Sequence, residues 1–175
     1  LADTRKNQTR YPQPGSQKPG CGFPVMKFVA LMSLTSGAIL NVILGSLHHH
    51  DLRLLRGLWD QLEKGDILLG DRAYGEYTTL ATGPKQGVDV IARLHQRRKV
   101  DFRKARRLGK NDGLFVWTKG YQQSEILSAT EWARLPVQIT VRLIRFTTAI
   151  RGFRSRRITL VTTLLDSGLF PAQDL

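Results

Sequence analysis

The carboxylate of Asp71 stands at the carboxyl end of a predicted strand, where the functional residues of α/β proteins gather. It follows Ile67, Leu68 and Leu69, a continuous apolar run typical of a short strand covered on both faces. At the carboxyl end of such a strand the backbone stops, and side chains can converge on a ligand. An Asp after a strand can also cap a helix or form a turn. Both interpretations stay open on these residues, and Asp66, in the turn before the run, is the weaker candidate.

The residues after Asp71 and the overall charge favour a polyanionic partner. Arg72 places a cation where a phosphate can lie, and Tyr74 with Gly75 gives the loop a shape suited to a nucleic-acid backbone. The formal net charge is +13, from 27 Lys and Arg against 14 Asp and Glu. Such an excess is common in proteins that bind nucleic acid or an anionic membrane surface, although it also keeps proteins soluble.

Positive charge is densest in the segment 95–110, where Asp101 is the single acidic residue. Lys and Arg at this density favour contacts with DNA phosphates over a solvated surface. Such contacts position a protein on DNA and do not read bases, so no target sequence follows. The predicted DNA-binding residues are Arg97, Arg98, Lys99, Arg103, Lys104, Arg106 and Arg107. More charge is expected from Arg142, Arg145, Arg151, Arg154, Arg156 and Arg157.

Three other features allow both a chemical and a structural interpretation. Consecutive side chains on a helix point about 100° apart, so His48, His49 and His50 indicate a helix start more than a metal site. His95 is expected to make a structural hydrogen bond, with a DNA contact as the alternative. Trp117 is expected in the core, although it could also stack on an unpaired base.

Hydrophobic patterns predict an α/β layer in the first half of the chain. The segment 25–47 contains two apolar runs of strand length, which predicts a hairpin of two core strands; the alternative is a membrane span. Residues 46–66 have the spacing of an amphipathic helix that ends at Gly65. A strand at 66–70, a helix at 77–85 and a strand at 88–94 then form a βαβ unit with parallel pairing.

The remaining segments are loop-like or β-rich. Residues 1–24 are expected to form an extended loop, because Pro12, Pro14, Pro19 and Pro24 oppose regular structure. Cys21 is the lone cysteine, which suits a reducing cytoplasm. In the second half, Ser128 and Glu131 have the spacing of a capping box and predict a short helix. Strands are predicted within 114–119, 137–147 and 156–165.

Four ordered stretches of the sequence resemble the DDE transposases of bacterial insertion sequences, in the IS-four group. They are 11–27 (YPQPGSQKPGCGFPVMK), 66–77 (DILLGDRAYGEY), 88–113 (VDVIARLHQRRKVDFRKARRLGKNDG) and 156–166 (RRITLVTTLLD). The resemblance implies an RNase H-like α/β fold, a mixed sheet with helices, and a β-rich insertion subdomain. The implied organisation is a core over 1–94, a basic insertion over 95–165, and the start of a return to the core over 166–175.

The resemblance also implies a role for Asp71. Asp71 matches the second of three catalytic carboxylates, two Asp and one Glu, which makes it a metal ligand with Arg72 as its active-site neighbour. The first Asp of the family stands on a strand before the Pro-rich loop, and the third acid on a helix with a Tyr, Arg, Glu and Lys pattern. This chain starts without Met inside the loop and stops at Leu175. We therefore expect a segment of a longer transposase, incomplete at both ends and inactive alone.

Cofactor, partner and location follow from the same resemblance. The complete enzyme is expected to use Mg²⁺ or Mn²⁺, which this segment would not bind tightly, because one Asp cannot hold two ions. Double-stranded DNA at transposon ends is the expected partner, with a homodimer of the full-length protein left open and no membrane. The expected location is the bacterial cytoplasm, at the nucleoid when DNA is bound. The alternative function is a non-catalytic basic DNA-binding module.

Overall fold

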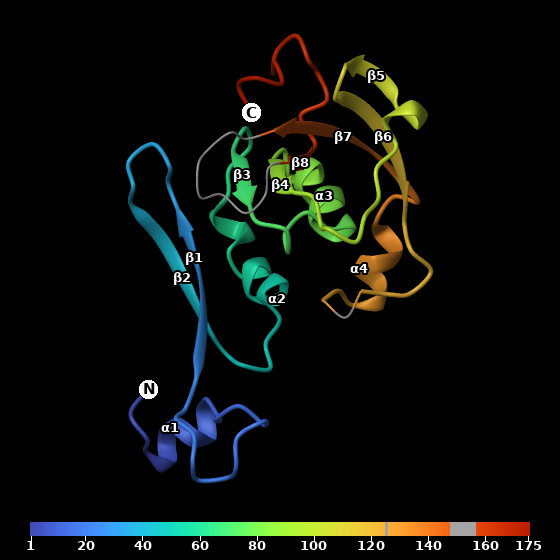
Figure 1. Cartoon of the computed structure of the whole chain (residues 1–175). Coiled ribbons are helices and arrows are strands. Elements are labelled where there is room, and N and C mark those ends of the chain that lie inside the picture. Colours follow the sequence, from blue (N-terminus) through green and yellow to red (C-terminus); the bar gives the residue numbers. More distant parts are fainter. Residues whose placement is uncertain (125, 148–156) are drawn as a thin grey trace. The chain divides into compact units, whose positions relative to one another are not determined.

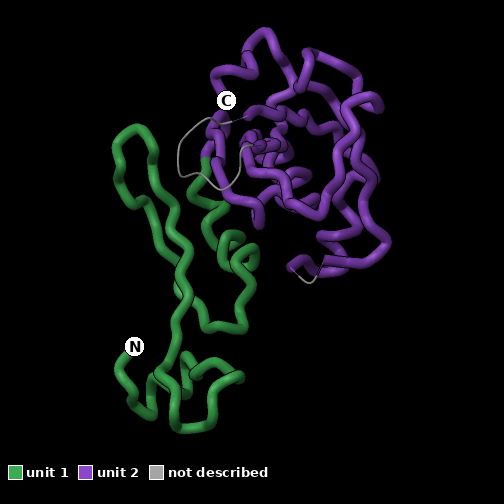
Figure 2. Tube along the Cα trace, in the orientation of Figure 1, with its two compact units in different colours: residues 1–62 green, residues 63–175 purple. Residues whose placement is uncertain are grey.

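The computed structural model describes residues 1–124, 126–147 and 157–175, which form short helices and two β-sheets (Figure 1). The chain divides into two compact units, unit 1 from Leu1 to Leu62 and unit 2 from Glu63 to Leu175 (Figure 2). Unit 2 contains a six-stranded mixed sheet with helices, which is consistent with an RNase H-like transposase domain. The expected α/β class is confirmed.

Unit 1 begins with a short helix, α1 (Arg5–Arg10), that the sequence analysis did not predict. The Thr4 hydroxyl accepts a hydrogen bond from the backbone N–H of Asn7 at 3.2 Å and caps this helix. The expectation of an extended loop over 1–24 is therefore wrong in its first part. The restriction that proline imposes begins only at Pro12, and the residues before it include neither Pro nor Gly.

The segment 25–47 forms the predicted hairpin, with β1 (Met26–Met32) antiparallel to β2 (Ile39–Ser46). Gly37 in the connecting turn has φ +72°, a left-handed conformation that glycine adopts without strain. The segment is thus a pair of strands and not a single long span. Across the described ranges, no helix has the length and apolar character needed to cross a membrane.

The two faces of the hairpin differ in burial. On one face Leu31 is buried, and Gly45 lies so close to Leu54 that an added Cβ would be 2.8 Å from its Cδ2. The large side chains of the other face are exposed: Phe28, Met32, Leu40, Val42 and Leu44. The expectation of two core strands is therefore correct for one face only.

The helix after the hairpin is shorter than the predicted 46–66. It consists of α2 (Asp51–Arg56) and the 3-10 helix η1 (Trp59–Gln61). Gly57 ends α2, and the extended backbone of Leu62 ends η1. The apolar spacing remains useful as a guide to burial, because Leu52, Leu54, Leu55, Leu58 and Trp59 are all buried.

The sheet of unit 2 has the strand order β3-β4-β8-β7-β6-β5, in which β3 and β4 are parallel and every other neighbouring pair is antiparallel (Figure 1). Its strands are β3 (Ile67–Gly70), β4 (Asp89–Arg93), β5 (Arg106–Gly109), β6 (Asp112–Thr118), β7 (Gln138–Thr147) and β8 (Arg157–Thr162).

The predicted βαβ unit is confirmed. Between β3 and β4 lie α3 (Tyr77–Thr82) and the 3-10 helix η2 (Gly83–Gln86), and Ile67 of β3 pairs with Asp89 of β4. Gly83 allows the helix to approach the sheet, since an added Cβ would lie 2.7 Å from the Val88 carbonyl oxygen. Leu80, Val88 and Val90 are almost fully buried at this contact.

Cross-strand pairing assigns side chains to the two faces of the sheet, because paired residues point to the same side. One face, called here the helix face, includes Ala92, Val161 and Leu143. An added Cβ on Gly75, just before α3, would lie 3.0 Å from Val161 on this face. The opposite face, called here the Arg142 face, includes Ile91, Thr162 and Arg142.

The prediction that β3 is covered on both faces is wrong. Leu68 points to the helix face and is buried, but Ile67 and Leu69 on the Arg142 face are 46% and 57% exposed. Helix α3 covers only one side of this edge strand. The continuous apolar run Ile67–Leu69 therefore predicted the strand correctly and its burial incorrectly.

The β-rich second half folds largely as predicted. Strands β6, β7 and β8 occupy the expected segments, and α4 (Ala129–Arg134) has the predicted capping box between Ser128 and Glu131. Trp117, Trp132 and Ile139 pack against a buried cluster of Tyr77, Ala81, Leu127 and Leu135. Because β5 to β8 continue the sheet of β3 and β4, the division between core and insertion at residue 95 stays a prediction.

Candidate functional site

Asp71 lies in a turn at the carboxyl end of β3, as the sequence predicted. Its Oδ1 accepts a hydrogen bond from the Ala73 backbone N–H at 2.8 Å, and its carbonyl oxygen accepts one from Tyr74 at 3.2 Å. The turn is tight, because an added Cβ on Gly70 would be 2.7 Å from Tyr74 Cβ. Asp71 is therefore a turn former. Its residue surface is exposed, and within the described residues no donor bonds to Oδ2.

The Arg72 side chain connects the segments that follow the two parallel strands. Its Nη1 donates a hydrogen bond to the Gln96 side-chain oxygen at 3.0 Å, across the carboxyl ends of β3 and β4. The contact directs the guanidinium along these strand ends. The predicted placement of Arg72 beside Asp71 in a strand-end loop is thus present, although the ligand roles of both residues stay predictions.

Glu76, which follows the Asp71 loop, is a helix-capping residue that the sequence analysis did not predict. It precedes α3 and accepts hydrogen bonds from Thr78 N, Thr79 N and Thr79 Oγ1 at 2.6, 2.5 and 2.7 Å. The carboxylate therefore caps the helix and also lies near the positive helix end. A Glu just before the first turn of a predicted helix was the signal that could have identified it.

The cations of the predicted DNA-binding segment differ in availability. Arg97, Lys99 and Lys104 are exposed, but Arg103 forms a bidentate ion pair with Asp101, with Nε and Nη2 each 2.9 Å from a carboxylate oxygen. The side-chain hydrogen bonds from Arg103 lower the pKa of Asp101 to about 2. Arg103 is consequently partly neutralised as a phosphate ligand.

The guanidinium of Arg98 packs against an aromatic ring. Its guanidinium carbon lies 3.9 Å from the centroid of Trp117. Burial of the guanidinium against the ring lowers the pKa of Arg98, and the charge of nearby Glu76 raises it in part. Trp117 also packs against the buried cluster around Tyr77, which agrees with its predicted core role. His95 accepts a hydrogen bond at Nδ1 from the Arg97 backbone, as the structural interpretation predicted.

The remaining predicted cations do not share one surface. Arg106 and Arg107 are neighbours on the edge strand β5 and point to opposite faces of the sheet. Arg142 is fully buried and ion-paired with Asp112, so its charge is not available at the surface. Arg145 lies over the Phe102 ring at 4.7 Å. Arg157 is exposed, and Arg151, Arg154 and Arg156 lie outside the described residues.

The potential metal-binding side chains of the described residues are not grouped into a complete metal site. Residues 1–124, 126–147 and 157–175 contain no group of three His, Cys, Asp or Glu side chains placed to hold one. Asp66 accepts a hydrogen bond from Glu63 N, and Asp89 accepts one from the Thr163 hydroxyl. His49 Nδ1 accepts from Ser46 N. Asp71 is thus a single potential ligand and does not by itself fit a pair of divalent ions.

The sequence of the chain matches a known protein family. The model of the transposase DDE domain family matches residues 3–174. The transposase InsG of insertion sequence element IS4 from Escherichia coli strain K12 is 22% identical over 173 residues, which is 99% of this chain and 37% of that protein. The chain thus spans little more than a third of this curated relative. No solved structure matches the chain. Since the family match covers almost its whole length, the chain belongs to the transposases with a DDE domain.

Proposed function

We propose that this chain is part of the catalytic domain of a DNA transposase, which cleaves DNA strands and transfers them to new sites. The observation that supports this most is the Asp71 carboxylate at the shared end of the parallel strands β3 and β4. Its Oδ1 is fixed by the turn, and its Oδ2 has no donor in the described structure. A carboxylate held in this way can bind a divalent cation through one oxygen without a conformational change.

The proposed role of Asp71 is one ligand of the Mg²⁺ or Mn²⁺ used for strand cleavage, and Arg72 is its phosphate-binding neighbour. Divalent ions bound by several carboxylates activate a nucleophile and stabilise the leaving oxygen in phosphoryl transfer. The described residues contain no group of three His, Cys, Asp or Glu side chains that could hold such an ion. We therefore propose that the 175-residue chain alone binds divalent ions weakly and does not cleave DNA.

DNA is the proposed partner through phosphate contacts of the 97–107 segment. Arg97, Lys99, Lys104, Arg106 and Arg107 are exposed and not ion-paired with a carboxylate in the described residues. Arg98 and Arg103 bind Trp117 and Asp101 and would contribute less. Transposon ends as the bound DNA, a homodimer of the full-length protein and action at the bacterial nucleoid belong to the same proposal.

The second candidate is a basic module that binds DNA without catalysis. The hydrogen bond from Ala73 to Asp71 favours it, because turn formation explains this Asp without a metal ion. The two candidates differ in one respect: only the first requires the negative charge of Asp71.

The substitution Asp71→Asn separates these roles, because an asparagine oxygen can still accept the Ala73 hydrogen bond while the charge is lost. The matched control is Asp66→Asn, which also keeps an acceptor in a turn of the same unit. Mn²⁺ binding to the chain with duplex DNA is measured by electron paramagnetic resonance. The proposal expects binding to weaken about tenfold or more in Asp71→Asn and to be unchanged in Asp66→Asn. Equal Mn²⁺ affinity in all three proteins would contradict the metal-ligand role.

DNA affinity is the companion measurement. Both candidates expect binding to a labelled duplex that weakens steeply with salt, because phosphate neutralisation releases counterions. Absence of duplex binding at low salt would contradict both candidates. Metal-dependent nicking by the chain alone, lost in Asp71→Asn, would contradict the proposed inactivity and strengthen the assignment of Asp71.

A further inference from the structure

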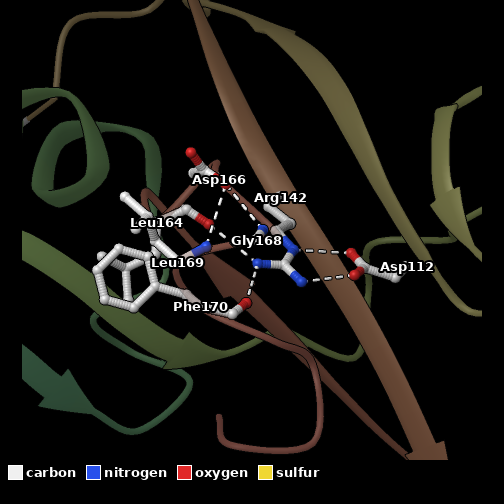
Figure 3. Close-up of polar contacts among 7 residues, drawn as sticks. All are labelled: Asp112, Arg142, Leu164, Asp166, Gly168, Leu169 and Phe170. Carbon is white, nitrogen blue, oxygen red and sulfur yellow. Dashed lines mark hydrogen bonds and ion pairs between the residues drawn. The ribbon is translucent and has the colours of Figure 1, made fainter.

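A buried ion pair lies in the unit that also contains the Asp71 loop. Arg142 of β7 is 0% exposed, and Asp112 of β6 is 7% exposed. Their side chains lie on the Arg142 face of the sheet, where Leu114 pairs with Arg142 and Asp112 pairs with Ile144. Nε and Nη2 of Arg142 donate to the two carboxylate oxygens of Asp112 at 2.8 and 2.5 Å (Figure 3).

The third guanidinium nitrogen binds a different part of the chain. Nη1 of Arg142 donates to the carbonyl oxygen of Phe170 at 2.6 Å and, at the long distance of 3.5 Å, to that of Leu164 (Figure 3). Both acceptors belong to the segment that follows β8, called here the exit segment (Leu164–Phe170). A planar guanidinium can serve both partners at once, since its donors point along fixed, divergent directions.

The exit segment has its own turn. The Asp166 carboxylate accepts hydrogen bonds from the backbone of Gly168 at 2.7 Å and of Leu169 at 3.2 Å, and Phe170 N donates to the Asp166 carbonyl oxygen (Figure 3). This turn brings the Phe170 carbonyl back to the sheet. Asp166 is exposed, so the turn itself is accessible to substitution without disturbing the buried pair.

We propose that Arg142 is a positioning residue, which fixes the exit segment against the sheet through Nη1 and thereby sets the path along which the chain leaves β8. An ion pair needed only to hold β6 to β7 would use two of the three nitrogens, and the main-chain ladder already joins these strands along their length. Nη1 instead binds carbonyl groups beyond β8. The inference goes beyond the proposed function and does not depend on DNA or metal binding.

Amide hydrogen exchange on the whole 175-residue chain, resolved by NMR, tests this role. In Arg142→Lys the single ammonium group cannot serve Asp112 and Phe170 together, so exchange at Gly168, Leu169 and Phe170 should accelerate about tenfold or more relative to the β6–β7 ladder amides. The matched variant Asp112→Asn keeps the guanidinium and its Nη1 bonds. In this variant, exchange at the exit-segment amides should accelerate no more than exchange at the β6–β7 ladder amides.

Two results would overturn the proposal: exchange of the exit-segment amides that is as slow in Arg142→Lys as in the parent, or an equal acceleration of their exchange in both variants. Equal acceleration would show that the pair only stabilises the sheet. If Arg142→Lys does not fold, the surface variant Asp166→Ala provides the test. It should speed exchange of the Arg142 side-chain N–H protons about tenfold while the ladder amides stay protected. Unchanged Arg142 side-chain exchange would then contradict the proposal.

Discussion

The Asp71 loop and the Arg142–Asp112 pair both contain an aspartate and an arginine, but only Asp71 is exposed to water. Asp71 is exposed, is held by its own turn, and has one oxygen without a described donor, while Arg72 binds Gln96 and not Asp71. Asp112 is buried, and both of its oxygens are used by Arg142. The first arrangement leaves a carboxylate available for a ligand, and the second satisfies it completely within the protein. The difference predicts that the first group serves binding and the second serves stability.

The largest expected effect is loss of the buried guanidinium. Arg142→Met leaves Asp112 buried without a partner and should lower the free energy of unfolding by about 3–5 kcal/mol. Urea unfolding of the whole chain, followed by tryptophan fluorescence, measures it. The double variant Arg142→Met with Asp112→Leu removes both charges and should recover most of the loss. A single variant with the stability of the parent would remove the contrast between the two regions.

A much smaller effect on stability is expected at the exposed carboxylate. Asp71→Asn keeps the acceptor for Ala73 N, so the free energy of unfolding should change by about 0.5 kcal/mol or less. Thermal unfolding with Asp71→Ala as the comparison checks this, since the alanine variant loses the turn bond as well. A loss of several kcal/mol in Asp71→Asn would show that Asp71 is a structural residue like Asp112.

The DNA-binding segment provides a comparison between paired and unpaired cations. Lys104→Ala should reduce the slope of log affinity against log salt by about one, because it removes one phosphate contact. Arg103→Ala should change the slope less, since Arg103 is already paired with Asp101. Fluorescence anisotropy with a labelled duplex at several salt concentrations measures both. Equal slopes in the two variants would show that the exposed ion pair opens on binding.

The smallest expected effect concerns pH. The pKa of Asp101 is lowered from 3.8 to about 2 by hydrogen bonds from Arg103, so the ionised form is favoured in the folded chain. The stabilising contribution is present above the unfolded pKa near 3.8 and is lost as the pH falls toward 2. Because both groups are exposed, the change in stability should be small. Carboxyl NMR titration should show the pKa of Asp101 returning toward its ordinary range in Arg103→Ala, and an unchanged pKa would contradict the pairing.

Local sequence patterns predicted the βαβ unit and the described strands other than β5 (Arg106–Gly109), because these elements depend on neighbouring residues. The apolar runs at 67–69 and 88–94, the hairpin within 25–47 and the capping box at Ser128 each depend on neighbouring residues. The same reasoning placed Asp71 at a strand end correctly. It missed helix α1, because the prolines that follow it dominated the pattern of the first segment.

Burial could not be predicted from the same patterns, because it depends on which elements cover each face. Arg142 was counted with the other cations of the second half, although it lies between Val141 and Leu143 in a strand whose centre is buried on both sides. A lone Arg inside such an apolar run was the available signal. The partner Asp112 is 30 residues away in the sequence, so only the pairing of β6 with β7 identifies it.

The proposed role of Asp71 is to offer a charged oxygen to a divalent ion at the end of β3. Paramagnetic broadening of backbone amide signals by low concentrations of Mn²⁺, with duplex DNA present, tests this role. The signals of Asp71, Arg72 and Ala73 should broaden first in the parent chain and stay sharp in Asp71→Asn. Equal broadening in the two proteins, or broadening centred on other carboxylates, would contradict the assignment of Asp71 as a metal ligand.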